Sequence, residues 1–327
     1  MLRAAILVTI CSWSIAMGGC TFESAHAESG ISTPLGERVW QTSDPVPLTI
    51  DPQRAIVNIG VGPWLTRATQ AKDFEPILNW LEESTGFDCV LNISPNYDSL
   101  KSDLLAGHID VAILSAAAYA DILNEPNANT TYIATVVAGE EQSRDSFYRG
   151  YIFTHADNQD ATLESLKGQP FAFVDKGSSS GFQYPLAMFL EAGIKPNKDF
   201  KSVFYLGSHD RVLSAVANGQ VYAGAVWDAT LLKAKENGGK FKVITETGRI
   251  PREAWVAASA VKKEVAAAIR AALIGATLET ETKAGQPALG GGYLYSGFKI
   301  EGPDFYKGVG LIRDVLKQYN HSLVEGE

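Results

Sequence analysis

Three consecutive serines form the segment of this chain best suited to hold an anion. Ser178, Ser179 and Ser180 precede a glycine and lie between an apolar run at 171–174 and a helical pattern that ends at Glu191. Hydroxyl groups and bare amides at a helix N-terminus donate hydrogen bonds to an anion, and the helix dipole adds a favourable field. The segment therefore predicts an oxyanion-binding loop, with a flexible loop carrying one capping serine as the structural alternative.

A second polar loop precedes the next helical pattern. His209 stands between Ser208 and Asp210, directly after the apolar run 203–206. Ser208 or Asp210 can cap the following helix, which leaves His209 free to point outward and to donate to an oxyanion, as a cation or as a neutral tautomer. The two loops together predict a binding site built from neighbouring strand–helix units, whereas a surface histidine at a helix start is the structural alternative.

Residues 177–181 also satisfy the G-x-S-x-G pattern of a serine hydrolase, with Ser179 as nucleophile. Such an enzyme needs an acid and then a base histidine later in the chain, and an oxyanion loop before the serine. His321 is the late candidate in a polar tail, and no HGGG-like segment precedes Ser179. We therefore favour a binding protein that breaks no bond and needs no cofactor or metal.

Both loops belong to a repeated pattern of a short apolar run, a small-residue loop and a helical stretch. Strands are predicted at 56–61, 88–93, 109–114, 132–138, 148–154, 171–174, 203–206 and 223–226, and helices at 74–84, up to Leu105, from Ser115, up to Glu191, up to Ala217 and after Asp228. This alternation predicts parallel sheets with helices on both faces. The ligand of such a sheet lies beyond the carboxyl ends of its strands, where the polar loops are found.

The composition excludes one class of partner. The 327 residues are 46% hydrophobic and carry a net charge of -9. Proteins hold nucleic acid with clustered Lys and Arg, so this charge argues against nucleic acid. It permits a small anion, because backbone amides can hold one without net positive charge.

The first residues predict export from the cytoplasm. An uncharged apolar run at 4–17 follows Arg3 and is too short to span a bilayer comfortably. We expect residues 1–19 to be a signal peptide.

Two processing sites compete after this run. The favoured one resembles a bacterial lipobox in which Cys20 is lipidated, so that a lipid anchor would be the only membrane attachment. Residues 25–27 form an A-x-A site that would instead release a free periplasmic protein. Residues 20–54 are rich in Ser, Pro, Gly and Thr, and we expect a flexible tether.

Taken together, the motifs resemble the phosphate/phosphite/phosphonate-binding family of ABC-transporter solute-binding proteins. The segments that carry the resemblance are 94–97, 107–112, 175–181, 207–210, 215–219, 223–228, the Gly-Phe-Lys segment at Gly297 and a helix at 305–316. The resemblance implies a two-lobe, periplasmic-binding-protein-like α/β fold of type II, with mixed, mostly parallel sheets and a hinge of two crossing segments. Lobe 1 is expected to comprise 55–151 and 252–327, and lobe 2 to comprise 152–251.

The resemblance also implies residue roles at the phosphoryl end. Ser178, Ser179 and Ser180 match positions that hold phosphoryl oxygens, and His209 matches a histidine that donates to the oxyanion. Tyr97 matches a first-lobe tyrosine that contacts the phosphoryl group.

Roles at the other end of the site are less closely matched. Tyr148 corresponds to a second tyrosine at the crossover between lobes, with Tyr151 as the alternative. Family members that select aminoalkyl phosphonates place carboxylates against the ligand amine; Asp228 is the candidate here, and Glu253 lies in a similar region.

The implied function is that of a solute-binding component of an ABC importer. It would capture a phosphonate, phosphite or phosphate between the lobes and deliver it to the permease. The same fold could bind a sulfonate or a thiamine precursor, or act as an extracytoplasmic sensor. The triple-serine loop and His209 favour a phosphoryl group with several oxygens.

Overall fold

The computed structural model describes residues 55–139, 144–289 and 295–310, together with Ile312 and Leu316. The predicted signal peptide, the tether, Cys20 and the A-x-A site lie outside the described residues. None of the helices in the described part is both long and apolar enough to cross a membrane.

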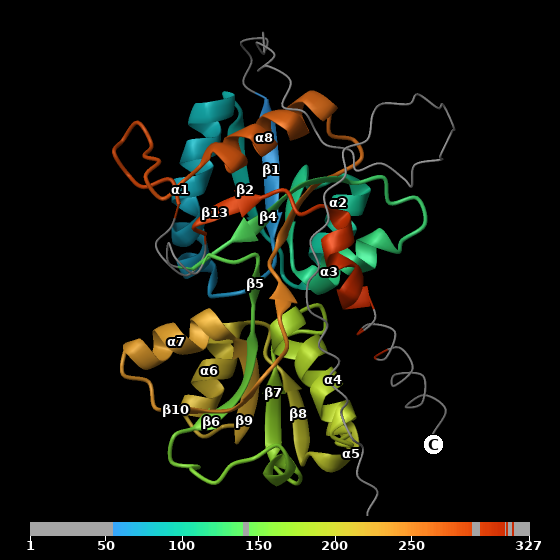
Figure 1. Ribbon diagram of the computed structural model, residues 1–327, viewed down its shortest axis with the longest axis vertical. Coiled ribbons are helices and arrows are strands. Elements are labelled where there is room, and N and C mark those ends of the chain that lie inside the picture. Colours follow the sequence, from blue (N-terminus) through green and yellow to red (C-terminus); the bar gives the residue numbers. More distant parts are fainter. Residues whose placement is uncertain (1–54, 140–143, 290–294, 311, 313–315, 317–327) are drawn as a thin grey trace, which may run out of the picture. The chain divides into compact units, whose positions relative to one another are not determined.

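Among the described residues, a six-stranded sheet with helices on both faces forms one layered unit, which we call lobe 1 (Figure 1). The strands, in sheet order, are β13 (Gly297–Lys299), β4 (Thr131–Val137), β12 (Ala254–Ala257), β3 (Val111–Leu114), β1 (Ile56–Val61) and β2 (Asp88–Ile93). The helices are α1 (Arg67–Thr85), α2 (Tyr97–Ala106), α3 (Ala116–Leu123) and α8 (Lys263–Gly275). β1 pairs in parallel with β2 and β3, whereas β12 runs antiparallel to β3 and β4.

The side chains of β3 show why this sheet is covered on both faces. Val111 and Ile113 join the cluster that contains apolar residues of α1 and α8. Ala112 and Leu114 join the cluster that contains apolar residues of α2 and α3. Successive strand residues point to opposite faces, so a continuous apolar run is what a sheet buried on both sides requires.

A five-stranded sheet with its own helices forms the second unit, lobe 2. The strands, in sheet order, are β10 (Phe241–Glu246), β6 (Gly150–His155), β9 (Ala223–Trp227), β7 (Pro170–Phe173) and β8 (Ser202–Tyr205). The helices are α4 (Tyr184–Glu191), α5 (Pro196–Asp199), α6 (His209–Ala217) and α7 (Asp228–Glu236), with short helical segments η1 (Glu164–Leu166) and η2 (Ser179–Gln183). β7 pairs in parallel with β8 and β9, and β6 is the antiparallel member beside β9.

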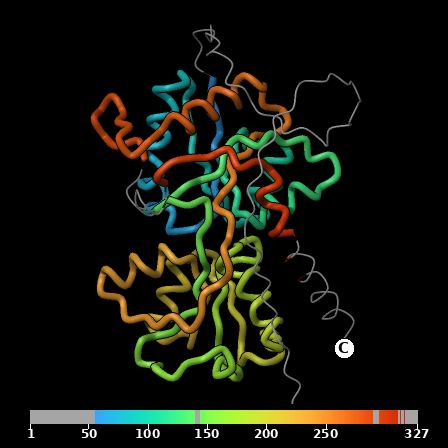
Figure 2. The backbone as a smooth tube through the Cα atoms, viewed as in Figure 1, coloured from blue at the N-terminus to red at the C-terminus, as the bar shows by residue number. Residues whose placement is uncertain are grey.

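Two short antiparallel strands connect the sheets. β5 (Phe147–Tyr148) pairs with β11 (Ile250–Pro251), so the segment leaving lobe 1 lies beside the segment that returns to it (Figure 2). β6 follows the first crossing and β12 follows the second, and each enters its sheet antiparallel to its neighbours. This pair of crossings is the expected hinge geometry.

Three predicted elements differ from the structure by more than one residue at an end. The helix expected from 74 begins at Arg67, where Thr66 caps it. The prediction missed this start because the first turn is exposed and has no apolar period. The strand expected at 148–154 is divided into β5 and β6, because the chain passes between sheets at that point. The strand expected from 109 begins at Val111.

The predicted closing helix at 305–316 lies partly outside the described residues. Phe305 and Tyr306 belong to the 3₁₀ helix η3 (Pro303–Tyr306), and 307–310 continue as α-helix.

Candidate functional site

All the predicted ligand-binding residues except Tyr148 lie just beyond the carboxyl ends of parallel strands, as expected for an α/β sheet. Tyr97 begins α2 after β2, whereas the serine segment follows β7 and His209 begins α6 after β8. Asp228 follows β9 directly, and Tyr148 lies in the crossing strand β5. The described loops of both lobes thus supply donors to one region.

The serine segment is held by its own backbone and side chains. The Gly177 amide donates to Asp175 Oδ1 at 2.8 Å, and the Ser178 amide donates to the Asp175 carbonyl at 2.9 Å. Ser178 Oγ accepts from the Gly181 amide at 3.0 Å and caps η2, which is one turn of π-helix. Single π-turns occur often at functional sites. Ser178, Ser179 and Ser180 are each no more than 2% exposed.

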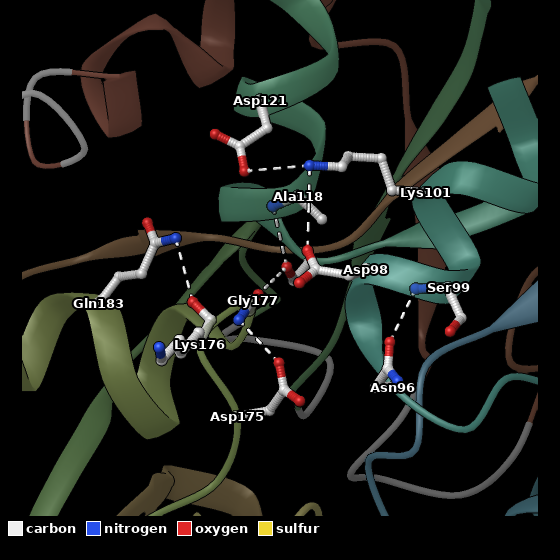
Figure 3. Close-up of polar contacts among 11 residues, drawn as sticks. Asn96, Asp98, Ser99, Lys101, Ala118, Asp121, Asp175, Lys176, Gly177 and Gln183 are labelled. Carbon is white, nitrogen blue, oxygen red and sulfur yellow. Dashed lines mark hydrogen bonds and ion pairs between the residues drawn. The ribbon is translucent and has the colours of Figure 1, made fainter. Parts of the chain in front are cut away.

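Ser179 joins the two lobes. Its Oγ accepts a hydrogen bond from the Ala117 amide at the start of α3 at 2.9 Å. Nearby, Ser115 Oγ donates to the Gly177 carbonyl at 2.8 Å and accepts from the Ala118 amide at 3.1 Å. Figure 3 shows Ala118 and Gly177, the two hydrogen-bond partners of Ser115. Because Ser179 Oγ accepts from the Ala117 amide, its own proton remains available for donation to another group.

Two buried tyrosines hydrogen-bond to the other serines. Burial raises the pKa of Tyr97, and a hydrogen bond with Ser178 opposes the shift. Burial also raises the pKa of Tyr148, whose hydroxyl bonds with Ser180. Both phenols are therefore neutral at physiological pH and keep an O–H proton to donate.

Gly177 allows Tyr97 to approach the serine segment closely. A Cβ built on Gly177 would lie 2.4 Å from the Cβ of Tyr97. Any larger residue would force the two segments, which come from different lobes, apart.

His209 is buried, not pointing outward as the sequence predicted. It is 4% exposed, its amide donates to the Trp64 carbonyl at 3.0 Å, and its Nδ1 accepts from the Trp227 amide at 3.2 Å. Burial lowers the pKa of the imidazole to about 3. His209 is therefore neutral, and with Nδ1 as acceptor its proton is on Nε2, which makes Nε2 the donor.

The predicted capping of α6 by Ser208 or Asp210 is wrong. Ser208 occupies the N-cap position without a side-chain cap bond, and its buried Oγ has no hydrogen-bond partner among the described residues. Asp210 Oδ2 instead accepts from the Thr66 amide at 3.0 Å. Thr66 precedes α1 in lobe 1, so Asp210 bonds across the lobes and is not available to its own helix.

Asp228 fixes backbone at the hinge. Its Oδ2 accepts from the Arg149 amide at 2.9 Å, and its Oδ1 accepts from the Ala229 amide at 2.7 Å. Burial raises the pKa of Asp228, while these hydrogen bonds and the charge of Arg252 oppose the shift. Tyr151, the alternative to Tyr148, is only half-buried and lies in β6.

Arg252 is a buried charged residue that the sequence analysis missed. It follows β11 in the second crossing, is 7% exposed, and its Cζ lies 5.5 Å from the centroid of the Tyr148 ring. Glu253, considered only as a carboxylate near the ligand, is also buried, and burial raises its pKa. A charged pair after a strand is ordinarily exposed, so the sequence contains no signal for this burial.

A cavity of about 250 Å³ lies beside the site. Leu65 and Asp73 line it from lobe 1, and Trp227 and Lys233 from lobe 2. Trp227 therefore borders both the cavity and His209. Within the described residues, no group of three or more His, Cys, Asp or Glu side chains is placed to hold a metal ion.

The sequence pattern of the family described as "ABC transporter, phosphonate, periplasmic substrate-binding protein" matches residues 59–299. The chain belongs to this family. The resemblance drawn from the motifs is thus confirmed, and the family's members are transport proteins that bind substrate.

One similar curated relative is the phosphate-import protein PhnD of Mycolicibacterium smegmatis. It is 27% identical over 176 residues, which cover 52% of this chain and 54% of the relative. The chain therefore matches only about half the length of this relative.

Two similar solved structures come from Prochlorococcus marinus and Pseudomonas aeruginosa. The first, PhnD1 in complex with methylphosphonate, has a TM-score of 0.70 at 17% identity and covers 82% of this chain and 99% of that chain. The second, a binding-protein component of an ABC phosphonate transporter, has a TM-score of 0.65 at 21% identity and covers 75% and 81%. The likeness confirms the predicted two-lobe, periplasmic-binding-protein-like fold of type II.

Proposed function

We propose that this chain binds a small phosphorus oxyanion (a phosphonate, phosphite or phosphate) between its lobes and delivers it to the permease of an ABC importer. The observation that carries the proposal is the convergence of neutral donors from both lobes. Ser179 and His209 Nε2 each retain a proton, and Tyr97 and Tyr148 are buried neutral phenols bonded to the serine segment. Each donor suits an oxyanion with several oxygens.

Closure of the lobes is part of the proposed mechanism. The four cross-lobe bonds described above join Ser115 to Gly177, Ala117 to Ser179, Trp64 to His209 and Thr66 to Asp210. Residues at the proposed site therefore also close it, so that a ligand bound by Ser179 and His209 would stabilise the closed state. Charge-assisted hydrogen bonds in a buried site would supply most of the affinity.

The lobe boundaries remain part of this proposal. We assign 55–151 and 252–327 to lobe 1 and 152–251 to lobe 2. The ends of the crossing strands support this assignment to within two residues, since β6 of lobe 2 begins at Gly150 and β11 ends at Pro251.

The proposed location is the periplasm or cell envelope, in agreement with the family's description. Residues 1–19 would be a signal peptide of the lipoprotein type, and Cys20 would carry the lipid that holds the protein at the membrane. Residues 20–54 would be the tether.

A serine hydrolase is not favoured at this site. Ser179 Oγ accepts from the Ala117 amide, and His209 Nδ1 accepts from the Trp227 amide. In a nucleophile–base pair, the serine would be hydrogen-bonded to the histidine. The proposed function includes no reaction step.

Calorimetric titration with phosphate, phosphite, methylphosphonate and 2-aminoethylphosphonate tests the proposed function. We expect heat with at least one of the four, and Kd values that differ among them. Absence of binding to all four, with the protein folded, would reject a phosphorus oxyanion as the ligand.

A further inference from the structure

Arg252 is a buried cation with unused donors. Its amide donates to the Ser146 carbonyl at 2.8 Å, which places the residue in the ladder between the lobes. Its Nε and Nη1 have no hydrogen-bond partner among the described residues, although the residue is only 7% exposed. A buried guanidinium with unsatisfied N–H groups is unfavourable unless an acceptor joins it.

The guanidinium borders the candidate site at its hinge end. It lies over the ring of Tyr148, whose hydroxyl is bonded to Ser180 of the serine segment. The same ring packs edge-on against Trp227 with centroids 6.3 Å apart, and the buried indole Nε1 of Trp227 also has no partner in the described part of the chain. Two kinds of N–H donor therefore lie beside the ring of Tyr148.

The neighbouring carboxylates leave these donors unused. Both oxygens of Asp228 accept from backbone amides, those of Arg149 and Ala229. Burial raises the pKa of Glu253, while the charge of Arg252 opposes the shift, and no hydrogen bond from Arg252 Nε or Nη1 reaches either carboxylate among the described residues. A ligand carboxylate at this end could accept hydrogen bonds from the two unused N–H groups of Arg252, whereas a ligand ammonium has no acceptor to offer them.

We propose that Arg252 binds a second acidic group at the hinge end of the site, so that the preferred ligands are phosphonates carrying a carboxylate, not an amine. The proposal rests on the proposed function, because it assumes that the serine segment holds the phosphoryl group. Arg252 is then a specificity-determining residue of the same site.

Three ligands of matched length test this preference. Phosphonoacetate, 2-aminoethylphosphonate and propylphosphonate place an anionic, a cationic and a neutral group at the same number of bonds from phosphorus. We expect wild-type protein to bind phosphonoacetate at least about tenfold more tightly than 2-aminoethylphosphonate, since one charge-assisted hydrogen bond corresponds to about ten- to a hundredfold.

The variant Arg252→Gln keeps a neutral hydrogen-bonding group and removes the charge. It should lose about ten- to a hundredfold in affinity for phosphonoacetate and no more than about threefold for propylphosphonate. Arg249→Gln is the matched control, because Arg249 is on the same crossing segment, its side chain is 56% exposed and it pairs with Asp145. Its affinities should equal those of wild type.

Either of two results would overturn the proposal. One is wild-type protein that binds 2-aminoethylphosphonate as tightly as phosphonoacetate, a comparison that does not depend on the variant folding. The other is an equal loss for all three ligands in folded Arg252→Gln, which would mean that Arg252 supports closure only. Binding of methylphosphonate without a preference for phosphonoacetate would reject this inference alone and leave the proposed function standing.

Discussion

Replacing Ser179 with alanine removes a hydroxyl that serves both lobe closure and, in the proposed complex, ligand binding. The hydroxyl accepts one cross-lobe hydrogen bond from the Ala117 amide at 2.9 Å and, in the proposed complex, donates its proton to the oxyanion. The first bond contributes about 0.5–1.5 kcal/mol and the second about 1.5–3 kcal/mol. Ser179→Ala should therefore weaken binding by about 2–4.5 kcal/mol, or roughly 30- to 2,000-fold.

Ser115→Ala is the matched control for this measurement. It removes the cross-lobe bond to the Gly177 carbonyl and the cap of α3, but no proposed ligand contact. Loss of the cap should lower the melting temperature but not the affinity, because the cap is present in open and closed states alike. Ser115→Ala should therefore weaken ligand binding only through loss of the cross-lobe bond, by about two- to tenfold.

The assay is calorimetric titration of both variants with the tightest of the four test ligands, supported by thermal melts to establish folding. A folded Ser179→Ala protein that binds within about threefold of wild type would refute the reasoning. So would equal losses in Ser179→Ala and Ser115→Ala, because the hydroxyl of Ser179 would then act in closure only.

Three further changes test other parts of the structure. Burial lowers the pKa of His209 from 6.5 to about 3. Between these pH values the unfolded chain binds a proton that the folded chain does not, so acidification from pH 6.5 to 4.5 should cost the wild-type fold about 2 kcal/mol more than it costs His209→Gln. The melting temperature of His209→Gln should therefore fall less than that of wild type over this range. Gly177→Ala places a Cβ against Tyr97 of the other lobe, and the resulting overpacking should cost about 1–3 kcal/mol and weaken ligand binding in titrations by about 5- to 150-fold. The control Gly248→Ala has open space around the new Cβ and should bind ligand like wild type. Cys20→Ser should move the protein from the membrane to the soluble fraction, as followed by immunoblotting; a wild-type protein that is already soluble would contradict the lipid anchor.

Much of the fold was predictable because local patterns are repeated along the chain. Short apolar runs such as 171–174, followed by small polar loops and helices, correctly indicated an α/β arrangement with the serine segment at a strand's carboxyl end. The sheets themselves are mixed, because the strands next to the crossings, β6 and β12, pair antiparallel with their neighbours. The boundary errors occurred where local pattern is weak. The first turn of α1 is exposed, and the crossing at Arg149 interrupts a run of strand-forming residues.

The sequence by itself determined which residues could meet an anion, since hydroxyls, glycines and helix starts are local features. Only the tertiary structure decided the state of each group. His209 is a neutral Nε2 donor because burial and the Trp227 amide make it so, and Asp210 serves the other lobe through Thr66. Only the structure identifies Arg252 as a candidate ligand-binding residue, because folding buries it beside Tyr148. Burial and cross-lobe partners depend on residues far apart in the chain, and no local pattern encodes them.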